Sequence, residues 1–216
     1  MSNVTNRTWE SKKVLFIGDS LTEHRIYPEA INEILGIQPF YHCKGGAGLI
    51  EMVDGERGLG GYYDNQTDAH GVLRPLNAEE VTDMDLIVFF GGYNSRHIPI
   101  GCVGESYSPN NETIAGMMQY CIDRIYEELG KANNLTCRLL IVTVDYSGKY
   151  PCVDLDGRGE VGGAGSVQTL EAMANIQVEI ARHNCLPVCD LFHTDDAGPY
   201  IEFSDKRLRW KAITAL

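Results

Sequence analysis

The chain has 216 residues, of which 44% are hydrophobic, and this is enough for one domain with a sizeable core. Its net charge of −12 and isoelectric point of about 4.9 argue against nucleic acid or an anionic membrane surface as a partner. No apolar run is long enough to span a bilayer, and residues 1–11 form a loose polar arm without the apolar core of a secretory signal. A signal removed beforehand would leave no trace in this sequence. The seven cysteines are scattered and form no C-x-x-C pair, which favours reduced thiols and a cytoplasmic protein.

Five apolar runs predict five buried strands. They lie at Val14–Ile17, Pro39–Cys43, Asp85–Phe90, Arg138–Val144 and Leu186–Leu191. The clearest runs, those at 14–17 and 86–90, do not alternate with polar residues, which is typical of strands buried on both faces of a parallel sheet.

Apolar residues at helical spacing predict the helices between these strands. They cover Glu23–Leu35, Leu49–Val53, Asn111–Leu129 and Val167–His183. Asn111 is the expected cap of the third helix, and Gly36 and Gly130 are the expected stops of the first and third. The glycine-rich stretches 54–82 and 146–165 are expected to be irregular. Strands that alternate with helices in this way predict a single α/β domain over residues 1–216, with a parallel sheet covered on both faces.

A serine follows the first strand directly, in the tetrapeptide Gly18-Asp19-Ser20-Leu21. Ser20 is therefore expected at the carboxyl edge of the sheet, where open α/β sheets bind their ligands. It also precedes a helix, whose N-terminus favours developing negative charge. The alternative is that Asp19 and Ser20 only cap that helix.

This tetrapeptide, at the end of a first strand, resembles the first sequence block of the GDSL, or SGNH, hydrolases. The resemblance implies a three-layer α/β/α sandwich with a flavodoxin-like parallel sheet of about five strands. It also implies a serine ester hydrolase in which Ser20 is the nucleophile. Members of this family hydrolyse esters and thioesters, and some deacetylate carbohydrates.

Two later stretches are similar to the second and third blocks of the family. The turn Lys44-Gly45-Gly46-Ala47-Gly48 follows the second strand, and its last glycine matches the residue whose backbone N–H enters the oxyanion hole. The family often begins this block with Asn, where this chain has Cys43. Gly92 and Asn94 match the third block, in which Ser95 replaces the usual Asp. The resemblance thus implies an oxyanion hole of Ser20, Gly48 and Asn94, whereas ordinary turn chemistry is the alternative for both glycine-rich segments.

The last block, D-x-x-H, has two candidates. Asp190-Leu191-Phe192-His193 matches it literally, which makes Asp190 the acid and His193 the base. However, Asp190 also ends the last predicted strand, and the family usually places this block further on. At that distance Asp205 supplies an alternative acid, but Leu208 stands at the histidine position. If Asp205 marks the true block, the chain lacks the base.

The function expected from the resemblance is hydrolysis of a small acyl ester through a covalent acyl-enzyme. An O-acetylated carbohydrate, a lipid or a thioester would be suitable, and no metal or organic cofactor is needed. Two other interpretations stay open: a catalytically silent binder of carbohydrate or another ligand, and a flavodoxin-like binder of nucleotide or phosphate. The second of these, the nucleotide or phosphate binder, lacks a phosphate-loop lysine and fits a strongly acidic chain poorly. The sequence leaves the oligomeric state undetermined.

Overall fold

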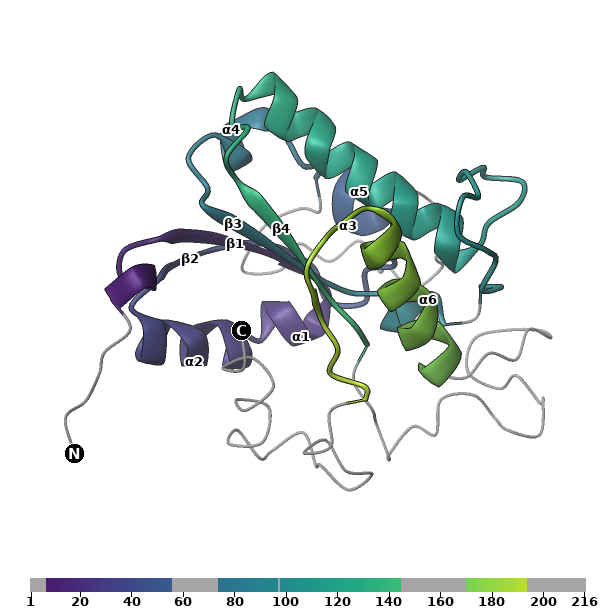
Figure 1. The fold of residues 1–216 in the computed structure, drawn as a ribbon, viewed down its shortest axis with the longest axis horizontal. Helices are drawn as coiled ribbons and strands as arrows, with labels where there is room; N and C mark the ends of the chain where they lie inside the picture. Colours follow the sequence, from purple (N-terminus) through teal and green to yellow (C-terminus); the bar gives the residue numbers. More distant parts are fainter. Residues whose placement is uncertain (1–6, 56–73, 97, 145–169, 194–216) are drawn as a thin grey trace.

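The computed structural model describes residues 7–55, 74–96, 98–144 and 170–193 (Figure 1). The predictions made for Asp205 and for the stretch 146–165 lie outside these residues. Five parallel strands form one sheet. They are β1 (Lys13–Gly18), β2 (Gln38–Cys43), β3 (Leu86–Phe90), β4 (Arg138–Val142) and β5 (Val188–Cys189). The spatial order is β2-β1-β3-β4-β5, which is the flavodoxin-like arrangement that the family resemblance implies.

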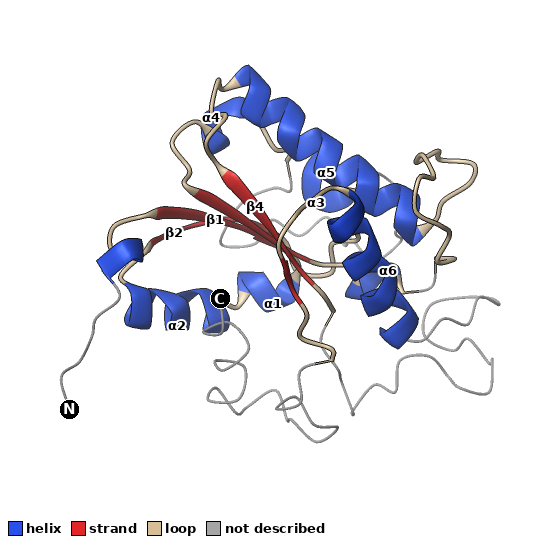
Figure 2. Ribbon diagram, viewed as in Figure 1, coloured by secondary structure: helices blue, strands red, loops and turns tan. Residues whose placement is uncertain are grey.

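Helices cover both faces of the sheet (Figure 2). One face carries α1 (Ser20–Glu23) and α2 (Ile26–Leu35). The other carries α3 (Glu51–Asp54), α4 (Ala78–Val81), α5 (Ile114–Lys131) and α6 (Leu170–His183). The fold is therefore a three-layer α/β/α sandwich.

Alternate residues of the central strands enter two separate hydrophobic cores. In β1, Leu15 and Ile17 pack into the core beneath α5 and α6, while Val14 and Phe16 pack against α2. All four side chains are at most 2% exposed, so the strand is buried on both faces as predicted. Burial of this kind is the main stabilising force for such a sheet, at about 25 cal/mol per Å² of apolar surface.

The ends of several helices differ from the prediction. The first predicted helix is divided into α1 and α2 at Arg25, whose backbone has φ of 56°. The cap of α5 is Thr113 rather than Asn111, because the Thr113 hydroxyl accepts the Gly116 N–H at 3.0 Å. The helix also runs through Gly130 to Lys131, one residue beyond its predicted stop.

Two stretches that were predicted to be irregular contain short helices. A 3-10 helix, η1 (Arg7–Trp9), lies within the expected N-terminal arm, and Trp9 packs against the α2 core. The helix α4 lies within the stretch 54–82. Asn77 starts α4 with a capping box, in which Asn77 and Glu80 bond each other's backbone N–H groups. The spacing of Asn77 and Glu80 is the sequence signal that the prediction missed.

The last strand is shorter than the predicted Leu186–Leu191. It begins two residues later, at Val188, because the chain is still leaving α6 at Leu186, whose N–H bonds the Ala181 carbonyl at 2.8 Å. After Cys189 the backbone turns away from the sheet, because the Thr143 hydroxyl accepts the N–H groups of Leu191 and Phe192.

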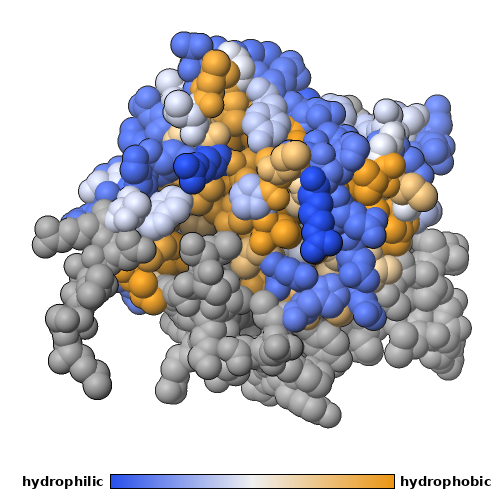
Figure 3. Space-filling view, in the orientation of Figure 1, coloured by the Kyte–Doolittle hydropathy of each residue, from blue (hydrophilic) through white to orange (hydrophobic). Residues whose placement is uncertain are grey.

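Among the described residues, no helix is long and apolar enough to cross a membrane. The surface carries both hydrophilic and apolar residues. Figure 3 shows apolar side chains gathered near the middle of one face, bordered by hydrophilic ones. The most exposed large hydrophobic side chain of the described residues is Leu135, at 80%.

Candidate active site

The candidate site residues all follow the carboxyl ends of strands. Ser20 begins α1 directly after β1, and Gly48 lies in the loop after β2. Asn94 lies in a 3-10 helix, η2 (Tyr93–Ser95), after β3, and Asp190 and His193 follow β5. Because the strands are parallel, these loops share one edge of the sheet. The edge includes the point between β1 and β3 where the strand order reverses and open sheets bind ligands.

The turn after β1 is closely packed. A side chain at Gly18 would overlap the Thr22 hydroxyl and lie 2.6 Å from the Phe90 carbonyl oxygen, so only glycine fits there. Asp19 is 2% exposed and caps α1, accepting the Leu21 N–H at 3.0 Å. Capping is therefore a role of Asp19, whereas Ser20 is half-buried at the first position of the helix.

The Asn94 amide connects the loops that follow β1, β2 and β3. Its Nδ2 donates to Asp19 Oδ2 at 3.3 Å and to the Ala47 carbonyl oxygen at 3.1 Å. Both partners are acceptors only, which fixes the amide nitrogen on this side. The loops after β1, β2 and β3 thus meet as predicted. Both amide hydrogens are engaged, so Asn94 can donate to a substrate oxygen only by exchanging one of these bonds.

The glycine-rich loop after β2 is held by backbone N–H groups. Lys44 donates to the Gly18 carbonyl at 3.2 Å, and Gly45 donates to the Glu23 carboxylate at 2.9 Å. At Gly48 a side chain would overlap the Glu51 carboxylate and lie 3.0 Å from the Ser95 hydroxyl, so a larger residue would displace both groups. The loop therefore lies against α1 with no side chain at the position expected to face an acyl group.

A buried glutamine, whose role the sequence did not reveal, supports the loop after β3. Gln177 of α6 is 0% exposed. Its Nε2 donates to the Gly91 carbonyl at 2.7 Å, and its Oε1 accepts the Val144 N–H at 2.8 Å. Gln177 thereby ties the ends of β3 and β4 together next to Asn94.

Asp190 and His193 are paired as an acid and a base would be. His193 Nδ1 lies 2.8 Å and 3.0 Å from the two oxygens of Asp190, and Asp190 also accepts the His193 backbone N–H at 3.2 Å. A carboxylate on Nδ1 favours the tautomer in which Nε2 is free to accept a proton. Among the described residues, however, no hydrogen bond joins His193 to Ser20. The acid therefore bonds the histidine, but in the described part of the chain the structure shows no bond from the histidine to the serine.

Another histidine near this edge has a different partner. His42 is 6% exposed, and its Nδ1 lies 3.0 Å from Glu80 Oε1. It precedes Cys43, the position where the second block of the resembled family often has Asn. His42 thus links the end of β2 to α4.

No protein-family model and no curated protein matches the sequence. Solved structures do share its fold. A possible lipase from Chitinophaga pinensis is 21% identical with a TM-score of 0.54, over 86% of this chain and 69% of that one. A proposed GDSL-like lipase from Bacteroides uniformis is 14% identical with a TM-score of 0.50, over 95% of this chain and 97% of that one.

A third similar structure is an active-site mutant of a family two carbohydrate esterase from Clostridium thermocellum. It is 12% identical with a TM-score of 0.54, over 94% of this chain but only 62% of the esterase. At these identities the likeness concerns the fold. The chain has the three-layer α/β/α fold of the GDSL, or SGNH, hydrolases.

Proposed function

We propose that this protein is a serine ester hydrolase of the GDSL/SGNH type that acts on a small acyl ester. The observation that carries the proposal is the Asn94 amide, which bonds both Asp19 and the Ala47 carbonyl. These bonds gather the three loops that hold Ser20, Gly48 and Asn94 at one edge of the sheet. A nucleophile beside several convergent N–H donors is what acyl transfer requires.

The reaction divides into two halves. His193 Nε2 accepts the Ser20 hydroxyl proton as Oγ attacks the acyl carbonyl, while Asp190 stabilises the imidazolium through Nδ1. The N–H groups of Ser20 and Gly48 and the amide of Asn94 hold the oxyanion. The imidazolium protonates the leaving alcohol, and water then releases the acid from Ser20 by the same route in reverse.

Two adjustments connect this mechanism to the geometry. Asn94 exchanges its longer bond, to Asp19 at 3.3 Å, for the oxyanion and keeps its bond to Ala47. His193 is part of a half-exposed turn after β5 and moves toward Ser20 when substrate binds. Catalytic hydrogen bonds that are long or absent without substrate commonly tighten in the complex.

The proposed substrate class is a short acyl ester, such as an O-acetylated carbohydrate, with a lipid or a thioester as alternatives. Its support is the fold, since similar structures include a possible lipase and a carbohydrate esterase. A short aryl ester such as p-nitrophenyl acetate is a suitable probe because it demands little of the alcohol pocket.

The test compares wild-type protein with Ser20→Ala, using Ser106→Ala as a control at an exposed serine. We expect Ser20→Ala to lower p-nitrophenyl acetate turnover by several orders of magnitude and to leave the fold intact. A fluorophosphonate should add one mass adduct to wild type and to Ser106→Ala but none to Ser20→Ala. Retained turnover or labelling in Ser20→Ala would end the hydrolase proposal.

A silent binder is the second candidate, favoured by the lack of a His193–Ser20 hydrogen bond among the described residues. In that case the three loops would bind a carbohydrate without cleaving it. Wild-type protein would then resist the fluorophosphonate and leave the aryl ester intact, yet bind a soluble oligosaccharide in calorimetry. Labelling at Ser20 excludes this candidate.

A further inference from the structure

Two consecutive residues of η2 hold the two peptide groups on either side of Gly48. The Asn94 side chain donates to the Ala47 carbonyl at 3.1 Å, and the Ser95 hydroxyl accepts the Leu49 N–H at 3.0 Å. In a trans peptide the C=O and N–H bonds point in opposite directions. The Ala47 bond therefore sets the direction of the Gly48 N–H, and the Leu49 bond sets the direction of the Gly48 carbonyl. We call these two side chains the Gly48 clamp.

Ser95 is well placed for this task. It is 5% exposed and Leu49 is 0% exposed, so water does not replace the hydroxyl as an acceptor. The Ser95 backbone is fixed by its own N–H, which donates to the Gly92 carbonyl at 2.9 Å. Gly92 has φ of 116°, a conformation that glycine adopts far more readily than other residues. A rigid turn thus presents both Asn94 and Ser95.

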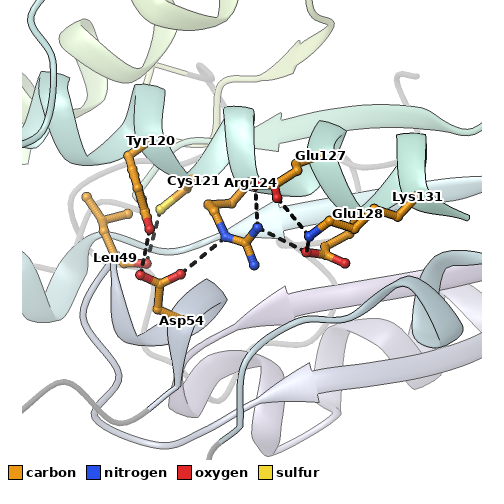
Figure 4. Close-up of polar contacts among 8 residues, drawn as sticks. All are labelled: Leu49, Asp54, Tyr120, Cys121, Arg124, Glu127, Glu128 and Lys131. Carbon is orange, nitrogen blue, oxygen red and sulfur yellow. Dashed lines mark hydrogen bonds and ion pairs between the residues drawn. The ribbon is translucent and has the colours of Figure 1, made fainter.

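The loop after β2, which contains Gly48 and Leu49, is also anchored to α5 (Figure 4). The Cys121 thiol donates to the Leu49 carbonyl at 3.1 Å, and burial raises its pKa well above the ordinary value, so it keeps its proton. On the same helix, the hydroxyl of the adjacent Tyr120 and the Nε of Arg124, about one turn further on, donate to the Asp54 carboxylate at 2.7 Å and 3.3 Å. These bonds tie α3, which follows the loop, to α5. The loop therefore has a fixed support from which the clamp can orient Gly48.

We propose that Ser95 is a positioning residue for the oxyanion hole, because the Gly48 clamp holds the Gly48 N–H in one orientation. The catalytic consequence rests on the proposed function, whereas the orientation of the loop does not. Ser95 stands where the resembled family usually has Asp, and in this chain its hydroxyl oxygen is the acceptor that the Leu49 N–H uses.

Removing the hydroxyl in Ser95→Ala leaves the Leu49 N–H buried without an acceptor, and the loop must relax to relieve it. We expect kcat for p-nitrophenyl acetate to fall by roughly tenfold to a hundredfold with KM within about twofold, because small misplacements of catalytic groups have effects of this size. Ser95→Thr retains the acceptor and should recover most of the loss. A change in KM alone would overturn the positioning role.

The control is Thr113→Ala. The Thr113 hydroxyl is also buried and also accepts a backbone N–H, that of Gly116 at 3.0 Å, but it caps α5 instead of holding the loop after β2. This variant should lose stability without a fall in kcat. If Ser95→Ala does not fold, Ser95→Cys takes its place, because sulfur is a weaker acceptor than the hydroxyl oxygen.

Amide hydrogen exchange, measured by NMR, tests the clamp without reference to catalysis. The Leu49 amide should exchange at least tenfold faster in Ser95→Ala than in wild type or Thr113→Ala. Unchanged Leu49 protection would overturn the clamp. Faster exchange with unchanged kcat would overturn the positioning role, and wild-type protein that cleaves no ester would overturn the proposed function while the exchange result still decides the clamp.

Discussion

At the scale of single residues, Asn94 connects the sequence blocks most directly. It lies 75 residues from Asp19 and 47 residues from Ala47, and it contacts both. Because its two amide hydrogens are already engaged, the site exchanges a protein hydrogen bond for one to substrate. The donor is therefore already oriented before substrate binds, and preorganised donors of this kind are the ones that stabilise an oxyanion most effectively.

Removing this donor tests its part in catalysis. We expect Asn94→Ala to lower kcat by about 10²–10³ with little change in KM, because the lost bond forms fully only in the transition state. Asn134→Ala is a matched control, since the Asn134 amide also donates to two backbone carbonyls, those of Val81 and Met84, but before β4. A purely KM effect in Asn94→Ala would show that Asn94 binds the substrate in its ground state.

The base is the second residue-scale prediction. We expect His193→Ala to approach the loss seen in Ser20→Ala, because a nucleophile and its base act as one unit. His183→Ala, which removes an exposed histidine at the end of α6, should leave turnover unchanged. Full activity in His193→Ala would contradict the assignment of His193 as the base.

At the scale of elements, a largely buried hydrogen bond between His42 and Glu80 connects β2 to α4. Glu80 of α4 contacts His42 at 3.0 Å and Arg74 at 2.7 Å. Burial alone would raise the pKa of the Glu80 carboxyl, but the bonds and charges of His42 and Arg74 outweigh it, so the pKa lies below its ordinary value of 4.5. The strand that leads into the glycine-rich loop is therefore held by a charged carboxylate.

Because the pKa of Glu80 is lowered in the folded protein, the free energy of unfolding should depend on pH. A carboxyl whose pKa is lowered by folding stabilises the folded state above the unfolded pKa, and this contribution is lost as pH falls further. The difference in unfolding free energy between wild type and Glu80→Gln should be largest near pH 7 and shrink below about pH 4.5, measured by urea unfolding. Glu79→Gln, at the adjacent exposed carboxylate, should show no such trend. A difference independent of pH would contradict the assignment.

At the scale of the whole molecule, the net charge of −12 acts on every substrate that approaches. A negative field lowers the local concentration of anionic substrates, and added salt screens it over about 10 Å at 0.1 M. We expect p-nitrophenyl acetate to be preferred over mono-p-nitrophenyl succinate at low salt. The ratio of their kcat/KM values should fall several-fold as NaCl rises from about 20 to 300 mM. A ratio unaffected by salt would mean that the pocket alone selects the substrate.

The sequence by itself determined which segments form the parallel strands and which loops follow them. Runs such as Val14–Ile17 and Leu86–Phe90 are short, apolar and without alternation, which is typical of a strand buried on both faces. The carboxyl ends of parallel strands lie at one edge of the sheet, so the segments that follow them, with Ser20, Gly48 and Asn94, are expected to meet there. That residues 1–216 form one domain stays a prediction, as do the catalytic roles.

Tertiary structure decided which groups at that edge touch. The bonds from Ser95 to Leu49 and from Asn94 to Asp19 span 46 and 75 residues, and no local pattern records them. The strand β5 also ends earlier than predicted, because the Thr143 hydroxyl accepts the N–H groups of Leu191 and Phe192, and Leu191 was expected to belong to the strand. Hydrophobic periodicity is a local property that a stretch of chain carries by itself. A hydrogen bond between distant loops depends on the packing of every element between them, so it exists only in the folded chain.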